Sequence, residues 1–175
     1  FVEPSRRLFL DSPWIEKPAF IQRTLYPVGS DFSRRNRLNL GYSFNHNLAK
    51  IFTADIYENR PEAFSIINGR RKTPLGSSRT DPQPNFTENV AVEIAARAAL
   101  DYFKTYPERT SYSLSINDNV LFDTGPRTKA AVSPLSYFRG RPDYTDLVFK
   151  FMNRVAERVF DQRGAWQTPM GEDRF

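Results

Sequence analysis

Apolar side chains recur at helical spacing in the middle of the chain. Five of them fall on one helical face: Ala91, Ile94, Ala95, Ala98 and Tyr102. Asn85 stands three residues before Glu88, which is the spacing of a capping box, and Pro107 cannot continue a helix. The pattern therefore predicts a helix that begins near residue 85 and ends before residue 107.

A second helical pattern lies near the end of the chain. Its apolar stripe consists of Val148, Phe151, Val155 and Val159. Asp143 or Thr145 can cap the start of this helix, and Gly164 lies just beyond the expected end. We expect a helix between these two signals.

Other segments alternate apolar and polar residues or are rich in β-branched and aromatic ones, which is typical of strands. We predict strands over residues 20–26, 37–44 and 110–116. Between the second and the third, an apolar run over 63–67 is followed by Asn68-Gly69 and then by basic residues. Asn-Gly is the usual turn of a β-hairpin, so we expect an inserted hairpin here.

The order of the elements is strand, strand, hairpin, helix, strand, helix. It predicts an α/β fold with β/α units on a mostly parallel sheet, in a single domain over residues 1–175. Residues 72–84 are rich in Pro, Gly, Ser and Thr, and we expect an exposed loop there. In such folds, functional residues gather at the carboxyl ends of the strands.

Polar side chains follow two of the predicted strands directly. Asn117, Asp118 and Asn119 end the third strand, and His46 with Asn47 follows the second. Amides and a carboxylate on a rigid strand can bind the hydroxyls of a sugar, and a histidine can act as a base if a carboxylate orients it. A plain turn and a structural histidine are the alternatives, and both stay open.

Further polar residues are less specific. Arg70 and Arg71 follow the hairpin turn and could bind a ligand carboxylate, although solvated surface charge is the ordinary alternative. Glu58 and Glu62 are close enough in sequence to converge. A metal site needs more ligands than one histidine, and no Gly-rich phosphate loop is present, so we expect no metal and no cofactor.

Composition narrows the function classes. The net charge of +5 is compatible with a polyanionic partner, but acidic residues are interspersed with the basic ones, which makes nucleic acid a poor candidate. The absence of cysteine excludes disulfides and a cysteine nucleophile. No stretch reaches the roughly 20 apolar residues of a membrane span. Because the first residue is Phe1 and not Met, we expect a processed, trimmed or partial chain.

Three blocks of the sequence resemble those of a known family, in the same order. They are HNLAKIFTADIYENRPEAFSIINGRR at 46–71, SLSINDN at 113–119 and YTDLVFKFMNRVAERV at 144–159. The family is a bacterial domain of unknown function that occurs in large, often secreted proteins. It is related to glycoside hydrolases of the α-glucuronidase and β-hexosaminidase type. The resemblance extends over about residues 18–163.

The resemblance implies a (β/α)8 barrel, which takes about 250 residues. A chain of 175 residues would then form a partial TIM-barrel-like fold of about three β/α units with the inserted hairpin. The rest of the barrel would come from a longer chain or an oligomer partner. The family often has cysteines where this chain has Leu121, Phe122 and Asp123, so no role of those cysteines is carried over.

The function implied by the resemblance is carbohydrate binding, with acidic and N-acetylated sugars as candidate ligands. The candidate binding residues are His46, Asn47, Arg71, Asn117, Asp118 and Asn119. Asp118 is the candidate catalytic carboxylate within the chain, while the usual catalytic carboxylates would lie beyond Phe175, so we expect the chain alone to be inactive. An extracellular or periplasmic location is also implied.

Two alternatives to this function remain. The first is a non-catalytic basic module that binds a polyanion, either an acidic glycan or nucleic acid. The second is a barrel that has kept its fold and lost its chemistry. Salt dependence separates the first alternative from a sugar site built of neutral hydrogen bonds, because only polyanion binding falls steeply with salt.

Overall fold

The structure is a computed structural model that describes residues 19–20, 22–25, 29–38 and 42–160. The chain divides into two compact units, residues 1–41 and 42–175. The described part of the first unit contains one short helix, α1, Ser30–Arg35. The predicted strand over 20–26 lies partly outside the described residues, and no strand runs through residues 22–25.

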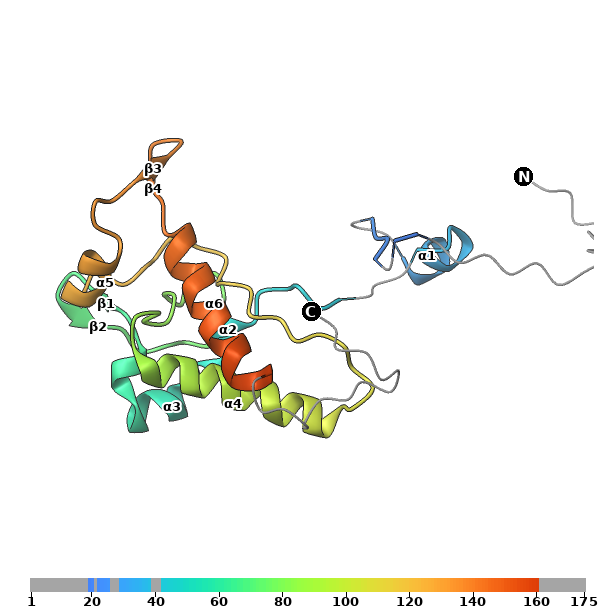
Figure 1. Ribbon diagram of the computed structural model, residues 1–175, viewed down its shortest axis with the longest axis horizontal. Coiled ribbons are helices and arrows are strands. Elements are labelled where there is room, and N and C mark those ends of the chain that lie inside the picture. The colour runs from blue at the N-terminus through green and yellow to red at the C-terminus, as the bar shows by residue number, and fades with distance from the viewer. Residues whose placement is uncertain (1–18, 21, 26–28, 39–41, 161–175) are drawn as a thin grey trace, which may run out of the picture. The chain divides into compact units, whose positions relative to one another are not determined.

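The described part of the second unit is mostly helical (Figure 1). Its helices are α2, Leu48–Ile51; α3, Ala54–Asn59; a 3-10 helix, Pro61–Ala63; α4, Asn89–Thr105; α5, Pro126–Ala131; and α6, Thr145–Phe160. None of the described helices combines the length and the apolar character needed to cross a membrane. Two small antiparallel sheets of two strands each complete the fold, which is therefore mixed α/β.

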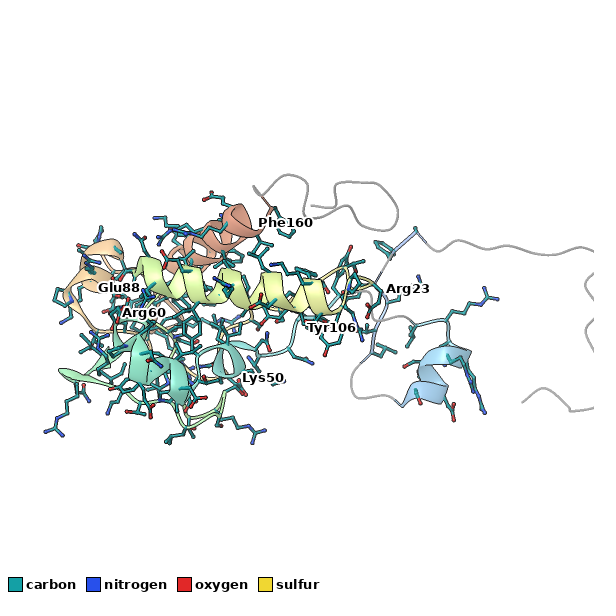
Figure 2. All side chains as sticks on the ribbon, turned by 90° about the horizontal axis from the view of Figure 1, so that it is seen from below. Arg23, Lys50, Arg60, Glu88, Tyr106 and Phe160 are labelled. Carbon is teal, nitrogen blue, oxygen red and sulfur yellow. The ribbon has the colours of Figure 1, made fainter. Side chains whose placement is uncertain are left out.

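Helix α4 confirms the first helical prediction, although its start differs. It follows Glu88 and ends before Tyr106, both labelled in Figure 2. The predicted capping box is wrong, because the Oδ1 atom of Asn85 accepts hydrogen bonds from the N–H and the hydroxyl of Thr87 at 3.2 and 2.7 Å. Asn85 thus closes a turn before the helix and does not cap it.

Helix α6 confirms the second helical prediction. Its four stripe residues are buried, each with at most 9% of its surface exposed: Val148, Phe151, Val155 and Val159. Asp143 Oδ1 accepts the N–H of Thr145 at 2.9 Å, as a cap should. Hydrogen bonds from the side chain and then the backbone of Thr145 hold the pKa of Asp143 below its usual value. Gly164 lies outside the described residues.

The apolar core forms where α4 and α6 pack against each other (Figure 1). Phe151 of α6 is 1% exposed, and its ring lies 4.7 Å from that of Phe86, which precedes α4. A second aromatic contact stacks Phe122 on Tyr144, with ring centroids 4.2 Å apart and an angle of 8°. The two predicted amphipathic helices therefore supply most of the driving force for folding.

The inserted hairpin is confirmed. Strands β1, Ile66–Ile67, and β2, Arg70–Arg71, pair in antiparallel fashion. Asn68 and Gly69 between them have φ angles of 53° and 74°, the left-handed conformation that this turn requires. A second hairpin, which the sequence analysis did not predict, consists of β3, Tyr137–Phe138, and β4, Arg141–Pro142, and it projects from the helices (Figure 1).

The predicted strand over 110–116 is wrong as a regular strand, and residues 42–44 of the second predicted strand are irregular too. A single parallel bridge joins the ends of the two segments, between His46 and Ser115. The reason is that side chains take backbone partners that a strand ladder would use. Ser111 Oγ accepts the N–H of Ser43 at 2.7 Å, and Ser113 Oγ donates to the carbonyl of Asn45 at 2.6 Å. The described residues show no closed barrel.

The loop over 72–84 is largely exposed as far as Thr80, whereas residues 81–84 are buried or half-buried, so the expected exposure does not extend over the whole loop. Leu75 is 82% exposed, whereas Asp81 and Gln83 are 3% and 0% exposed. The carboxylate of Asp81 accepts the N–H groups of residues 75, 76 and 77, which folds the loop back over its own second half. Polar composition did not predict this burial, because the buried side chains of Asp81 and Gln83 make hydrogen bonds within the protein.

Truncation of a buried side chain and of an exposed side chain on α6 should have very different effects on stability. We expect Phe151→Ala to lower the free energy of unfolding by about 3 to 5 kcal/mol, because it leaves a cavity against Phe86. Phe149→Ala is the matched control, since Phe149 lies on the same helix and is 59% exposed. Its effect should stay within about 0.5 kcal/mol. Urea unfolding monitored by circular dichroism measures both, and equal effects would contradict the packing of α6.

Candidate functional site

The ends of the second and third predicted strands lie side by side and run in the same direction. The parallel bridge between His46 and Ser115 is reinforced by a hydrogen bond from the N–H of Asn47 to the carbonyl of Ser115, at 3.1 Å. The imidazole Nδ1 of His46 lies 2.5 Å from the carbonyl oxygen of Ile116. These contacts bring the polar residues after both segments to one place.

His46 and Asp118 form the accessible part of this place. Nε2 of His46 lies 3.7 Å from Oδ1 of Asp118, and the two side chains are 44% and 59% exposed. Because a carbonyl only accepts, Nδ1–H of His46 donates a hydrogen bond to the carbonyl oxygen of Ile116. When the ring is uncharged, this leaves Nε2 as an acceptor. Two acceptors so close together suit a ligand that presents two adjacent hydroxyl donors.

Asn117 faces the opposite way and is only 2% exposed. Its Oδ1 accepts the N–H of Ala49 at 2.9 Å, and so caps the start of α2 from another segment. Its Nδ2 donates to the carbonyls of Asp81 and Pro82, both at 3.1 Å. The space beside it has a volume of about 10 Å³, which is enough for one water molecule at most. The amide of Asn117 thus has an internal role.

Asn119 also uses its side chain within the protein. Its Nδ2 donates to the carbonyls of Ser78 and Asp81 at 3.0 and 2.7 Å, and its Oδ1 accepts the N–H of Leu121 at 2.9 Å. The buried amide of Gln83 completes this arrangement: it accepts the N–H of Asn117 at 2.9 Å and donates to the carbonyls of residues 117 and 119. Amides that looked like ligand groups in the sequence therefore hold the loop in place.

The remaining predicted residues, Asn47 and Arg71, use their side chains in internal hydrogen bonds. Asn47 donates through Nδ2 to the carbonyl of Ser113 at 2.9 Å. Arg71 donates to the carbonyl of Phe64 at 2.6 Å, and within the described residues it makes no hydrogen bond or ion pair with His46 or Asp118. Of the six predicted residues, His46 and Asp118 are the ones whose polar atoms face solvent beside each other.

Of the two glutamates considered above, Glu62 is partnered by a basic residue. It accepts a hydrogen bond from Arg60 at 2.9 Å, and this bond lowers the pKa of Glu62. Within the described residues, no group of three or more His, Asp or Glu side chains is arranged to hold a metal ion.

A pocket that the sequence analysis missed lies between α5 and the start of α6. It has a volume of about 290 Å³, and its polar lining residues are Asp123, Thr124, Thr128, Lys129, Ser133 and Tyr144. Val132 and Leu135 supply aliphatic surface. The Gly125-Pro126 pair that opens α5 was a usable signal, because proline favours the first turn of a helix.

Comparison with known proteins identifies a family for most of the chain. Residues 3–164 match the family model described as a domain of unknown function, DUF4838. No curated protein and no solved structure matches the chain. The match agrees with the resemblance to a domain of unknown function that the sequence blocks indicated, and it begins earlier in the chain.

Substitution of the two neighbouring residues Asn117 and Asp118 should affect stability very unequally. We expect Asn117→Ala to lower the free energy of unfolding by about 2 to 4 kcal/mol, because it leaves the N–H of Ala49 and the carbonyl of Pro82 without these partners and removes one of the two donors to the carbonyl of Asp81. Asp118→Ala should change it by less than about 0.5 kcal/mol, since Asp118 is exposed. Chemical unfolding of both variants measures this, and a neutral Asn117→Ala would contradict the internal role of the amide.

Proposed function

The chain belongs to the DUF4838 family of domains of unknown function, and we propose that it is the carbohydrate-binding part of a glycoside-hydrolase-like (β/α) barrel. In this proposal His46 and Asp118 bind adjacent hydroxyl groups of a glycan at the barrel mouth. The observation that carries it is their separation of 3.7 Å at the ends of two parallel segments.

Two features of the chain support a barrel-like arrangement. The segments around His46 and Ser115 are parallel, and α4 lies between them in the sequence, as expected for a β/α crossover. The helix after the second segment, α6, packs on α4, as helices of consecutive β/α units do. In that arrangement the polar residues after each strand face the mouth.

The chemistry of the pair supports a hydroxylated ligand. In its uncharged form His46 offers a lone pair at Nε2, because Nδ1 donates to the carbonyl of Ile116, and Asp118 offers carboxylate oxygens. Neighbouring hydroxyls of a sugar ring can donate one hydrogen bond to each. The side chain of Gln83 accepts the N–H of Asn117, and the side chain of Asn117 accepts the N–H of Ala49. These hydrogen bonds fix the backbone next to Asp118.

The proposal assigns binding to this chain, and not bond cleavage. Hydrolysis of a glycosidic bond usually needs two carboxyl groups at a set separation. Asp118 supplies one such group at the site. A second would come from another part of the barrel, in line with the relation to glycoside hydrolases that the sequence blocks suggested.

A second candidate function is favoured by the β3–β4 hairpin. Tyr137 and Phe138 are each 66% exposed, and the guanidinium carbon of Arg139 lies 5.3 Å from the centre of the Phe138 ring. Exposed rings beside Arg139 and Arg141 suit a polyanion, through stacking and charge. A basic interaction module that binds an acidic glycan or nucleic acid is therefore the alternative proposal.

Removal of the Asp118 carboxylate tests the leading proposal. We expect the full chain to bind glucuronic acid or N-acetylglucosamine oligosaccharides, and Asp118→Ala to weaken this binding about ten- to hundredfold, because a charge-assisted hydrogen bond is lost. Asp101→Ala, an exposed change on α4, is the matched control and should bind like the wild type. Isothermal titration calorimetry measures all three proteins, and unchanged binding by Asp118→Ala would refute the site.

The salt dependence of binding separates the two candidate functions. If His46 and Asp118 bind the glycan, affinity should change less than about threefold between 50 and 200 mM salt. A polyanion held by the hairpin should instead lose affinity steeply over this range, and the double change Arg139→Gln with Arg141→Gln should flatten the slope. Heparin serves as the polyanion probe, and a steep slope for the oligosaccharides would favour the interaction module.

A further inference from the structure

We propose that the pocket between α5 and the start of α6 is a second carbohydrate subsite that binds one acidic monosaccharide unit. The proposal deepens the function given above and rests on it, since it places a further sugar unit on the same chain. Four features of the pocket carry it: an unpaired hydroxyl, a buried carboxylate, a rigid aromatic wall and a cation at the rim.

The hydroxyl of Thr128 has no hydrogen-bond partner although the residue is only 1% exposed. Among the described residues it is the one buried side-chain oxygen or nitrogen atom in this condition. A buried hydroxyl without a partner destabilises a protein, and so it is rare unless something else satisfies it. Thr128 lines the pocket, so a ligand hydroxyl placed there would supply the missing bond.

The carboxylate of Asp123 adds a second polar group to the lining. Asp123 is 4% exposed, and its oxygens accept the N–H groups of Ile66 at 2.6 Å and Gly125 at 2.9 Å. Each oxygen keeps a further lone pair for a sugar hydroxyl. A Cβ atom on Gly125 would lie 2.9 Å from Oδ2 of Asp123, so a larger residue there would displace the carboxylate.

Tyr144 supplies an aromatic wall in a fixed orientation. One face of its ring stacks on Phe122 with an angle of 8°. Burial, and then the charge of Asp123, raise the pKa of Tyr144, so its phenol keeps the proton that it can donate to a ligand. Aromatic and aliphatic surface from Tyr144, Val132 and Leu135 suits the C–H face of a sugar ring.

The size of the pocket and the charge at its rim restrict the class of ligand further. A volume of about 290 Å³ is at the lower end for ligand pockets, which suits one sugar ring and not an oligosaccharide. Lys129 is exposed and is the one basic residue in the lining. Its ammonium group can pair with the carboxylate of a uronic acid, whereas a neutral sugar gains nothing from it.

The test compares glucuronic acid with glucose as probes of the full chain. Amide chemical shifts in two-dimensional NMR spectra follow this pocket and the His46–Asp118 pair separately. We expect glucuronic acid to shift the amides of α5 and to bind more tightly than glucose. Thr128→Val keeps the shape of the side chain and removes the hydroxyl, so it should weaken binding here about tenfold. Thr73→Val, an exposed change in the loop over 72–84, is the control.

A stability measurement guards against a folding artefact. Thr128→Val should leave the melting temperature of the free protein unchanged or raise it, because the valine has no unpaired hydroxyl. Lys129→Gln should abolish the preference for glucuronic acid over glucose. If neither sugar shifts the amides of α5, or if Thr128→Val binds like the wild type, the subsite is refuted.

The experiments can refute either of the two proposals without refuting the other. If Asp118→Ala loses glycan binding while sugars leave the amides of α5 unmoved, the proposed function stands and the second subsite is refuted. If sugars shift the α5 amides but Asp118→Ala binds glycans normally, the pocket binds sugar and the assignment of His46 and Asp118 is wrong.

Discussion

Two buried side-chain amides, those of Gln83 and Asn117, hold the second unit together. They are 0% and 2% exposed, and they bond the loop before α4, the segment after Ile116 and the start of α2. Buried backbone groups without partners are costly, and these amides satisfy groups that no regular sheet satisfies here. The apolar packing of α4 on α6 provides the driving force, but the amides determine how the irregular segments meet.

The internal hydrogen bonds of Asn117 also determine which neighbouring polar groups can still bind a ligand. Asn117 is buried, whereas the next residue, Asp118, lies in a bend and is exposed. His46 is fixed on the neighbouring segment by Ile116 and comes within 3.7 Å of Asp118. An accessible pair of acceptors is thus a direct consequence of a buried and fully bonded amide behind it.

The sequence predicted those parts of the fold whose signals are local. Stripes such as Val148 to Val159 specified the long helices, and Asn68-Gly69 specified the first hairpin, because its turn needs positive φ angles. Helices α2, α3 and α5 are too short to show periodicity. The strand over 110–116 failed because Ser111 and Ser113 compete for backbone partners, and the strand-end amides were interpreted as ligand groups because sequence does not show which side of a segment is buried.

Whether a polar residue can recognise a ligand depends on the hydrogen bonds that it has not yet made. Asn117 and Asn119 have used their amides, so binding through them would first break internal bonds. Nε2 of His46, the carboxylate of Asp118 and the hydroxyl of Thr128 retain that capacity. Unsatisfied groups, and not polar residues as such, therefore define where this protein should bind.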